Sequence, residues 1–189
     1  MSPPRVRWWE RPESPTAFIS HASADATQAA EIVRVLEAAR LRCWLAPRDI
    51  PVGSEWATAI VDGIRRSRLL VVVFSVRSCA SPEVYREVEL ASRERKPMLT
   101  VRIDRTAELT GPLAFFLSSI QWFEATARPL RPQLGRLPST VAGLLDVPVT
   151  PPPPPTAAPV SGAQPEESIR SVSLDDLTRS GPIFRPWAH

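Results

Sequence analysis

Glu87 is the first residue of this sequence to suggest chemistry. It lies in the stretch 81–91, which reads as the first turns of a helix, directly behind the apolar run 69–74. A strand that leads through a Ser-rich loop into a helix places carboxylates at the carboxyl edge of a parallel sheet, where open α/β folds bind ligands. That position makes Glu87 the first candidate for chemistry in this sequence. The alternative is a solvated surface charge, the usual state of a helical Glu.

Other polar side chains follow the predicted strands at the same edge. The first strand leads into Ser20 and His21, the second contains Trp44 before a Pro-rich loop, and the third is followed by the loop 75–81. The carboxyl ends of parallel strands meet at one edge, so these groups are expected to line one cleft with Glu87. The predicted cleft side chains are Ser20, His21, Trp44, Ser75, Ser78, Ser81, Glu83 and Glu87.

Strand and helix patterns alternate five times between residues 15 and 146. The strands are predicted at 16–20, 42–45, 69–74, 98–103 and 120–123. The run 69–74 has no polar alternation, which is typical of a central strand covered on both faces. With right-handed crossovers, this alternation predicts a doubly wound α/β fold with a parallel sheet in the order 2-1-3-4-5.

The helices between these strands carry further local signals. Ser23 and Ser54 are placed to cap two of them. Trp56 lies on the apolar stripe of its helix and is expected to pack in the core. Pro132 and Pro138 are expected to break or kink the helical pattern at 130–145. The inner stripe of the helix that begins near Pro82 is predicted to consist of Val84, Val88 and Ala91.

Length and composition predict one domain at 15–146, preceded by a flexible leader at 1–14. Of the 22 prolines, ten lie from residue 147 onward, which favours a Pro-rich linker and a largely disordered tail at 147–189. A partner-binding segment at 168–187 is the alternative for that tail. The domain itself has the length of one ordinary core.

Charge and cysteine usage exclude several classes of function. The 23 basic and 20 acidic side chains alternate along the helices instead of clustering, so no nucleic-acid partner is expected. Cys43 and Cys79 lack metal-ligand spacing, so no metal site is expected, and a reducing cytoplasm is the simplest location. No apolar stretch approaches the roughly 18 residues of a membrane span, so no membrane partner is expected.

The same region lacks the motifs of several enzyme classes. No glycine precedes residue 53, which excludes a Gly-rich phosphate loop after the first strand. Phosphoacceptor receiver domains need carboxylates where this chain has Ser20, His21 and Ser75, so phosphorelay chemistry is disfavoured. Ser75 has no GxSxG context, which leaves serine hydrolysis as a weak alternative.

Four separated blocks of the sequence resemble bacterial Toll/interleukin-1 receptor (TIR) domains in order and spacing. They are FISHASAD from Phe18, RCWLAPRDIPVGSEWATAIVDGIRRSRLLVVVFSVRSCASPEVYREVELA from Arg42, KPMLTVRID from Lys96 and FFLSSIQWFEA from Phe115. The similarity spans about residues 15 to 146, which is the whole predicted core.

The resemblance implies a flavodoxin-like fold with a catalytic glutamate at the position of Glu87. It also implies that residues 46–53 form the so-called BB loop, a contact between domains and a wall of the substrate cleft, with Arg48 beside Trp44 as a pocket residue. The loop residues expected to interact are Pro47, Arg48, Asp49, Ile50, Pro51 and Gly53. The chain departs from many active relatives in having Glu83, and not an aromatic residue, four positions before Glu87. It also has Ala46 where an acidic residue frequently follows the second strand.

Many bacterial relatives cleave NAD+ to nicotinamide and ADP-ribose or a cyclised product, often in antiphage defence. The resemblance thus implies NAD+ as a substrate, no cofactor, and self-association or contact with other TIR domains, with a separate sensor protein as a further partner. Animal members mostly act as scaffolds, so a non-enzymatic docking module is the second hypothesis. A nucleoside-transferring enzyme on a similar fold is the third.

Overall fold

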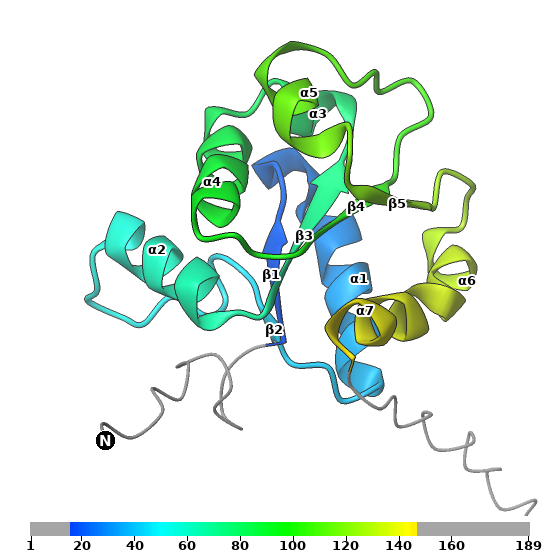
Figure 1. Ribbon diagram of the computed structural model, residues 1–189. Helices are drawn as coiled ribbons and strands as arrows, with labels where there is room; N and C mark the ends of the chain where they lie inside the picture. Colours follow the sequence, from blue (N-terminus) through cyan, green and yellow to red (C-terminus); the bar gives the residue numbers. More distant parts are fainter. Residues whose placement is uncertain (1–15, 147–189) are drawn as a thin grey trace, which may run out of the picture. The chain divides into compact units, whose positions relative to one another are not determined.

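A parallel sheet of five strands runs through residues 16–146, the part of the chain that the computed structural model describes (Figure 1). The strand order is β2-β1-β3-β4-β5, which confirms the predicted order. The strands are β1 (Ala17–Ser20), β2 (Cys43–Trp44), β3 (Leu69–Phe74), β4 (Met98–Arg102) and β5 (Gln121–Glu124). The predicted leader at 1–14 and tail at 147–189 lie outside the described residues.

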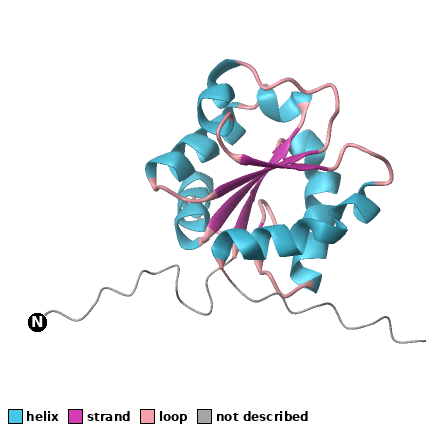
Figure 2. Ribbon diagram, turned by 45° about the vertical axis from the view of Figure 1, so that its right-hand side comes forward, coloured by secondary structure: helices cyan, strands magenta, loops and turns pink. Residues whose placement is uncertain are grey.

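Helices cover both faces of the sheet (Figure 2). They are α1 (Ala26–Ala38), α2 (Trp56–Arg66), α3 (Val76–Cys79), α4 (Pro82–Arg93), α5 (Gly111–Leu117), α6 (Leu130–Gln133) and α7 (Leu137–Leu145), with 3₁₀ turns η2 (Ser23–Asp25) and η3 (Leu134–Arg136). Side chains of α1, η3 and α7 pack on one face, and those of α2, α4 and α5 pack on the other.

The central strand β3 contributes to both halves of the core. Leu69, Val71 and Val73 belong to the cluster under α1 and α7, while Leu70, Val72 and Phe74 belong to the cluster under α4 and α5. All six side chains are fully buried, as the unbroken apolar run predicted.

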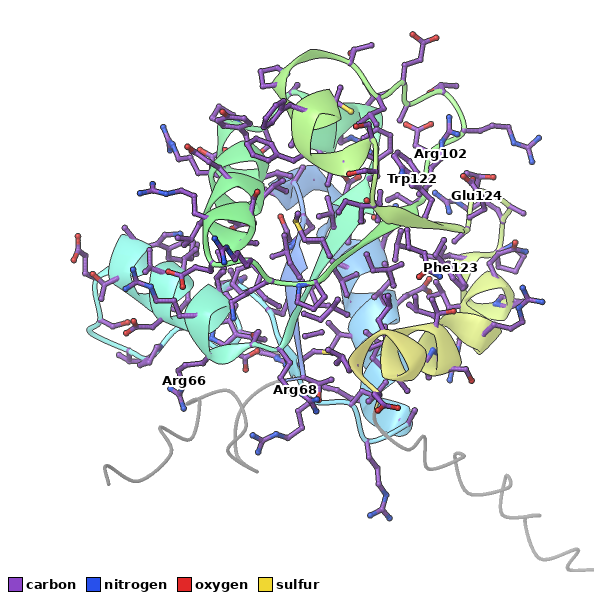
Figure 3. All side chains as sticks on the ribbon, in the orientation of Figure 1. Arg66, Arg68, Arg102, Trp122, Phe123 and Glu124 are labelled. Carbon is purple, nitrogen blue, oxygen red and sulfur yellow. The ribbon has the colours of Figure 1, made fainter. Side chains whose placement is uncertain are left out.

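The two outer strands of the sheet differ in burial, since both residues of β2 are buried whereas β5 is partly exposed. At one edge, β5 pairs only with β4, and its residues Gln121 and Glu124 are exposed. Arg102 of β4 and Glu124 of β5 lie side by side there, with 3.8 Å between their Nη1 and Oε1 atoms (Figure 3). This ion pair is solvent-exposed, so its contribution to stability is small.

Helix α4, which carries Glu87, begins as predicted. The Ser81 hydroxyl accepts a hydrogen bond from the Val84 backbone amide at 3.3 Å, and Pro82 occupies the first turn, where its missing N–H costs nothing. Val84, Val88 and Ala91 are fully buried, which confirms the predicted inner stripe. The rotation of α4 about its axis is therefore fixed by these three side chains.

Two predicted caps are wrong. Ser23 lies in the turn η2, and α1 begins only at Ala26 without a side-chain cap. Ser54 donates to the Pro51 carbonyl at 2.7 Å inside the preceding loop, and α2 begins two residues later. In both places the serine lies in a turn before the helix, so its side chain does not cap the helix.

Two segments consist of short helices separated by breaks. The predicted loop 75–81 contains the short helix α3, which Ser75 caps. The pattern at 130–145 is divided into α6, η3 and α7, and Pro138 lies in the first turn of α7. The expected break in that pattern is thus confirmed.

Replacing Gly63 with Ala is expected to destabilise the fold. Helix α2 crosses the Trp44 indole at Gly63, and a Cβ there would lie 2.7 Å from Trp44 Cε2. The indole cannot retreat, because it stacks on Phe18 at a centroid distance of 4.7 Å. We expect a loss of about 2 kcal/mol in urea unfolding. Gly143→Ala in α7 is the control, since a Cβ there meets nothing within 4 Å; an equal loss in both variants would contradict this account.

Candidate functional site

The Glu87 carboxylate faces the end of β1. The Ser20 hydroxyl donates a hydrogen bond of 2.6 Å to Glu87 Oε2, across 67 residues of sequence. Ser20 is fully buried and Glu87 is partly buried. The strand end fixes the hydroxyl, and the buried stripe of α4 fixes the carboxylate, so neither group has to be ordered when a ligand arrives.

Burial shifts the ionisation of this carboxyl group. Desolvation raises the pKa of Glu87 from 4.5 to about 7, the hydrogen bond from Ser20 opposes this rise, and the nearby charge of Glu83 adds to it. The carboxylate therefore ionises near neutral pH. A carboxyl group with such a raised pKa in a partly open site is a candidate for chemistry.

Glu87 also lines a groove between α2 and α4, a cavity of about 200 Å³ that we call the α2–α4 groove. The α4 side consists of Glu83, Arg86, Glu87 and Leu90, which share one helix face because they are spaced three and four residues apart. The α2 side includes Trp56, Ile60 and Ile64. The walls are mainly apolar, and the charged groups all come from α4.

Trp56 does not pack in the core, so that prediction is wrong. Its surface is 54% exposed, whereas Ile64, two turns further along the same stripe, is 1% exposed. Trp56 is the first residue of α2, and all residues from 51 to 58 are exposed. It supplies the one aromatic wall of the α2–α4 groove, on the helix that faces Glu83 and Glu87.

His21 and Ser81 lie near the ends of the elements that hold Ser20 and Glu87. His21 follows Ser20 directly, its Nδ1 atom is 3.4 Å from the Ile19 carbonyl, and burial lowers the pKa of its imidazole. Ser81 donates to Glu83 Oε2 at 3.1 Å while it caps α4. No hydrogen bond joins either residue to Glu87 among the described residues, so a substrate role for each stays a prediction.

Ser75 and Ser78 are engaged in a buried network instead of facing Glu87. The Ser75 hydroxyl donates to Asp25 Oδ2 at 2.5 Å and caps α3 together with Ser78. Arg77 Nη1 donates to Asp25 Oδ1 at 2.9 Å, and Asp25 is fully buried. The network joins the segment after β1 to the segment after β3. A substrate role for Ser75 stays a prediction.

Arg48 braces the base of the loop 46–53. Its guanidinium donates to both carboxylate oxygens of Glu37, at 3.1 and 2.8 Å, to Asp49, and to the Cys43 carbonyl at 2.7 Å. Asp49 in turn accepts from the Leu45 amide at 2.8 Å. These hydrogen bonds raise the pKa of Arg48 above its usual value. Arg48 thus holds the loop in shape, and its role as a pocket residue stays a prediction.

The remaining residues of the loop frame a separate cavity and an exposed tip. Trp44, Asp49 and Pro51 line a cavity of about 460 Å³ at the β2 edge, and Glu87 is not among its residues. Val52 is fully exposed at the tip, and Gly53 has a φ of 81°, a left-handed conformation that favours glycine. The predicted loop residues Pro47 and Ile50 lie within the same segment.

The sequence matches the TIR domain family over residues 17–136. The chain belongs to the TIR domain family. The matched range holds all five strands and both Ser20 and Glu87. No curated protein matches the sequence at a significant level.

A solved TIR domain from an animal receptor shares this fold. The TIR domain of the Toll-related receptor TRR-2 from Hydra magnipapillata is 20% identical, with a TM-score of 0.57; the match covers 68% of this chain and 98% of that one. A match to the TIR domains of the activated Roq1 resistosome, which recognises the pathogen effector XopQ, is 17% identical with a TM-score of 0.43; it covers 70% of this chain and 84% of that one. At 20% identity, the likeness to the Hydra domain concerns the fold alone.

Two further features of this TIR domain concern metals and membranes. Within residues 16–146, no three side chains of His, Cys, Asp or Glu gather closely enough to hold a metal ion. In the same range, no helix has the length and apolar character to cross a bilayer.

Sequence reasoning identified Glu87 in this TIR domain but missed its surroundings. Asp25 carries no local signal of its burial, because an Asp near a helix start usually lies in solvent. Arg86 is exposed outside the buried stripe of α4, and the structure places it on the same groove as Glu87. The spacing of residues 83, 86, 87 and 90 was the signal that could have revealed this shared face.

Proposed function

We propose that this TIR domain is an NAD+ hydrolase that releases nicotinamide. The observation that carries the proposal is the Glu87 carboxylate, held by the Ser20 hydroxyl at 2.6 Å and open to the α2–α4 groove. We further propose that it acts in the cytoplasm as a bacterial immune signalling enzyme in antiphage defence, becoming active when copies associate, with a sensor protein upstream.

One carboxylate suffices for this reaction. The bond between the nicotinamide nitrogen and the ribose carbon breaks, and its electron pair stays with the nitrogen, so a cationic ring leaves as a neutral molecule. No acid is needed to protonate the leaving group, unlike the usual glycosidase with two carboxyl groups. Positive charge grows on the sugar, and the fixed negative charge of Glu87 stabilises it. Water then bonds to the sugar carbon and loses a proton.

Ser20 has a positioning role in this scheme. Its hydroxyl donates to Oε2 of Glu87 and leaves Oε1 for a ribose hydroxyl. The same hydrogen bond lowers the pKa of the carboxyl group and so opposes the effect of burial. Ser20 therefore keeps more of Glu87 in the ionised form at neutral pH.

The rate of nicotinamide release is expected to rise with pH through about 7. Below that pH Glu87 is protonated and carries no charge to stabilise the sugar, because burial raises its pKa to about 7. A profile of kcat/KM between about pH 5.5 and 8.5 checks this, since it reports the ionisation of the free enzyme. Ser20→Ala should move the midpoint upward. A flat profile in the unsubstituted protein would contradict an ionised Glu87 in catalysis.

The proposal is tested by measuring nicotinamide release from NAD+ with purified full-length protein. The assay is run at high protein concentration, with and without a crowding agent, because association is proposed to activate the enzyme. Turnover that rises more steeply than protein concentration supports the proposal. Absence of nicotinamide in all conditions, in protein that self-associates through the loop 46–53, would refute it.

A non-enzymatic docking module is the second candidate, and the loop 46–53 favours it. Arg48 braces the base of the loop, and Val52 presents a fully exposed apolar tip. A preformed apolar protrusion suits contact with another protein, including a second copy. This function needs the loop but not Glu87, so Val52→Asp and Glu87→Gln separate the two candidates. The third, a nucleoside-transferring enzyme, predicts turnover of free nucleosides in place of NAD+.

A further inference from the structure

Arg86 is the one cation among the side chains that line the α2–α4 groove in the described part of the chain. It is exposed, and its guanidinium forms no hydrogen bond or ion pair with the rest of residues 16–146. Hydrogen bonds from the Glu83 backbone amide and from Ser81 lower the pKa of Glu83, and the charge of Arg86 adds a smaller, longer-range attraction. The Arg86 guanidinium is therefore a positive charge in the groove that does not stabilise the fold through a hydrogen bond or ion pair within residues 16–146.

The surroundings of Arg86 are acidic. Glu83 and Glu87 share its groove face on α4, three residues before and one residue after it. An anionic ligand in the groove would be repelled by these two carboxyl groups, and Arg86 is the side chain there that can offset the repulsion. A guanidinium also presents a planar fork of donors that matches the oxygens of a phosphate.

The spacing suits a ligand that reaches both Glu87 and Arg86. Both residues line the groove, and the long Arg86 side chain starts one residue away from the carboxylate proposed to hold the ribose. In NAD+, the diphosphate is attached to the same ribose that loses nicotinamide. Trp56 and Ile60 on the opposite wall offer apolar surface and leave the phosphates no other cation in the groove.

We propose that Arg86 binds the diphosphate of the substrate and makes the site selective for a dinucleotide over a nucleoside. This inference rests on the proposed function, since it concerns the same groove. Arg86 acts on substrate binding and takes no part in breaking the bond. Its loss raises KM for NAD+ and leaves kcat nearly unchanged, as expected for an interaction made equally in the ground state and the transition state.

The test compares two substrates that share the reacting bond, NAD+ and nicotinamide riboside, which has no phosphate. Arg86→Ala should lower kcat/KM for NAD+ by roughly 10- to 100-fold, the range for a lost hydrogen bond to a charged group, and change it less than about twofold for nicotinamide riboside. Arg86→Lys should restore part of the loss by its charge alone. Arg93→Ala is the matched control, because Arg93 lies exposed on the same helix but not on the groove.

A binding measurement decides the role of Arg86 separately from catalysis. ADP-ribose and adenosine are titrated calorimetrically into the Glu87→Gln protein with and without Arg86→Ala. Loss of ADP-ribose affinity with unchanged adenosine affinity supports the inference. Equal effects of Arg86→Ala on both substrates, unchanged KM for NAD+, or absent or Arg86-independent binding of ADP-ribose would overturn it. Absence of turnover with every substrate, beside Arg86-dependent binding, overturns the hydrolase proposal alone.

Discussion

Glu87→Gln is expected to lower kcat for nicotinamide release by about 100- to 1000-fold, the usual loss when one preorganised electrostatic group is removed from a site. Gln is nearly isosteric and its amide oxygen can still accept from Ser20, so the geometry survives while the negative charge is lost. The measurement is steady-state release of nicotinamide from NAD+. Glu89→Gln, on the same helix but outside the groove, is the matched control and should keep full activity.

The same variant should gain stability near neutral pH. The pKa of Glu87 is raised from 4.5 to about 7 by folding, so the folded protein binds more protons than the unfolded chain in this range. The contribution of Glu87 to stability is therefore greatest below about pH 4.5 and is lost as pH rises through 7. Gln cannot ionise, so the variant should exceed the unsubstituted protein by up to about 3 kcal/mol above pH 7. In the assay of nicotinamide release, full turnover in Glu87→Gln would refute the catalytic assignment. An equal loss of turnover in Glu87→Gln and Glu89→Gln would also refute it.

Asp25→Ala is expected to destabilise the domain by about 3 kcal/mol. The carboxylate is fully buried, accepts from Ser75 at 2.5 Å, and pairs with Arg77 at 2.9 Å. Its removal leaves the Ser75 hydroxyl without its acceptor and opens a gap between the segments that follow β1 and β3. Urea unfolding monitored by fluorescence gives the change in free energy.

The control for Asp25 is Asp62→Ala on α2. Asp62 is exposed and forms no hydrogen bond with the rest of residues 16–146, so its loss should change stability by less than about 0.5 kcal/mol. A loss below about 1 kcal/mol in Asp25→Ala would mean that the buried network contributes little. An equal loss in both variants would point to net charge, and not the network, as the cause.

The sequence alone determined the layout of the domain. The apolar run 69–74 predicted a central strand, and the alternation of strands and helices favoured the order 2-1-3-4-5, which the structure has. The buried stripe of α4, with Val84 and Val88, followed from its spacing. The position of Glu87 near the end of β1 also followed, because polar groups gather at the carboxyl edge of a parallel sheet. Each of these features depends on local periodicity or on topology.

Only the tertiary structure decided which side chains meet. Ser20 faces Glu87 and Ser75 faces Asp25, although both serines were expected in the same cleft. Trp56 shows the same limit: periodicity placed it on the apolar stripe, but the first turn of α2 is exposed. A pattern fixes which face of an element is apolar. It does not fix where each element ends against its neighbours or which partner a polar group finds, because those depend on contacts between residues distant in the chain.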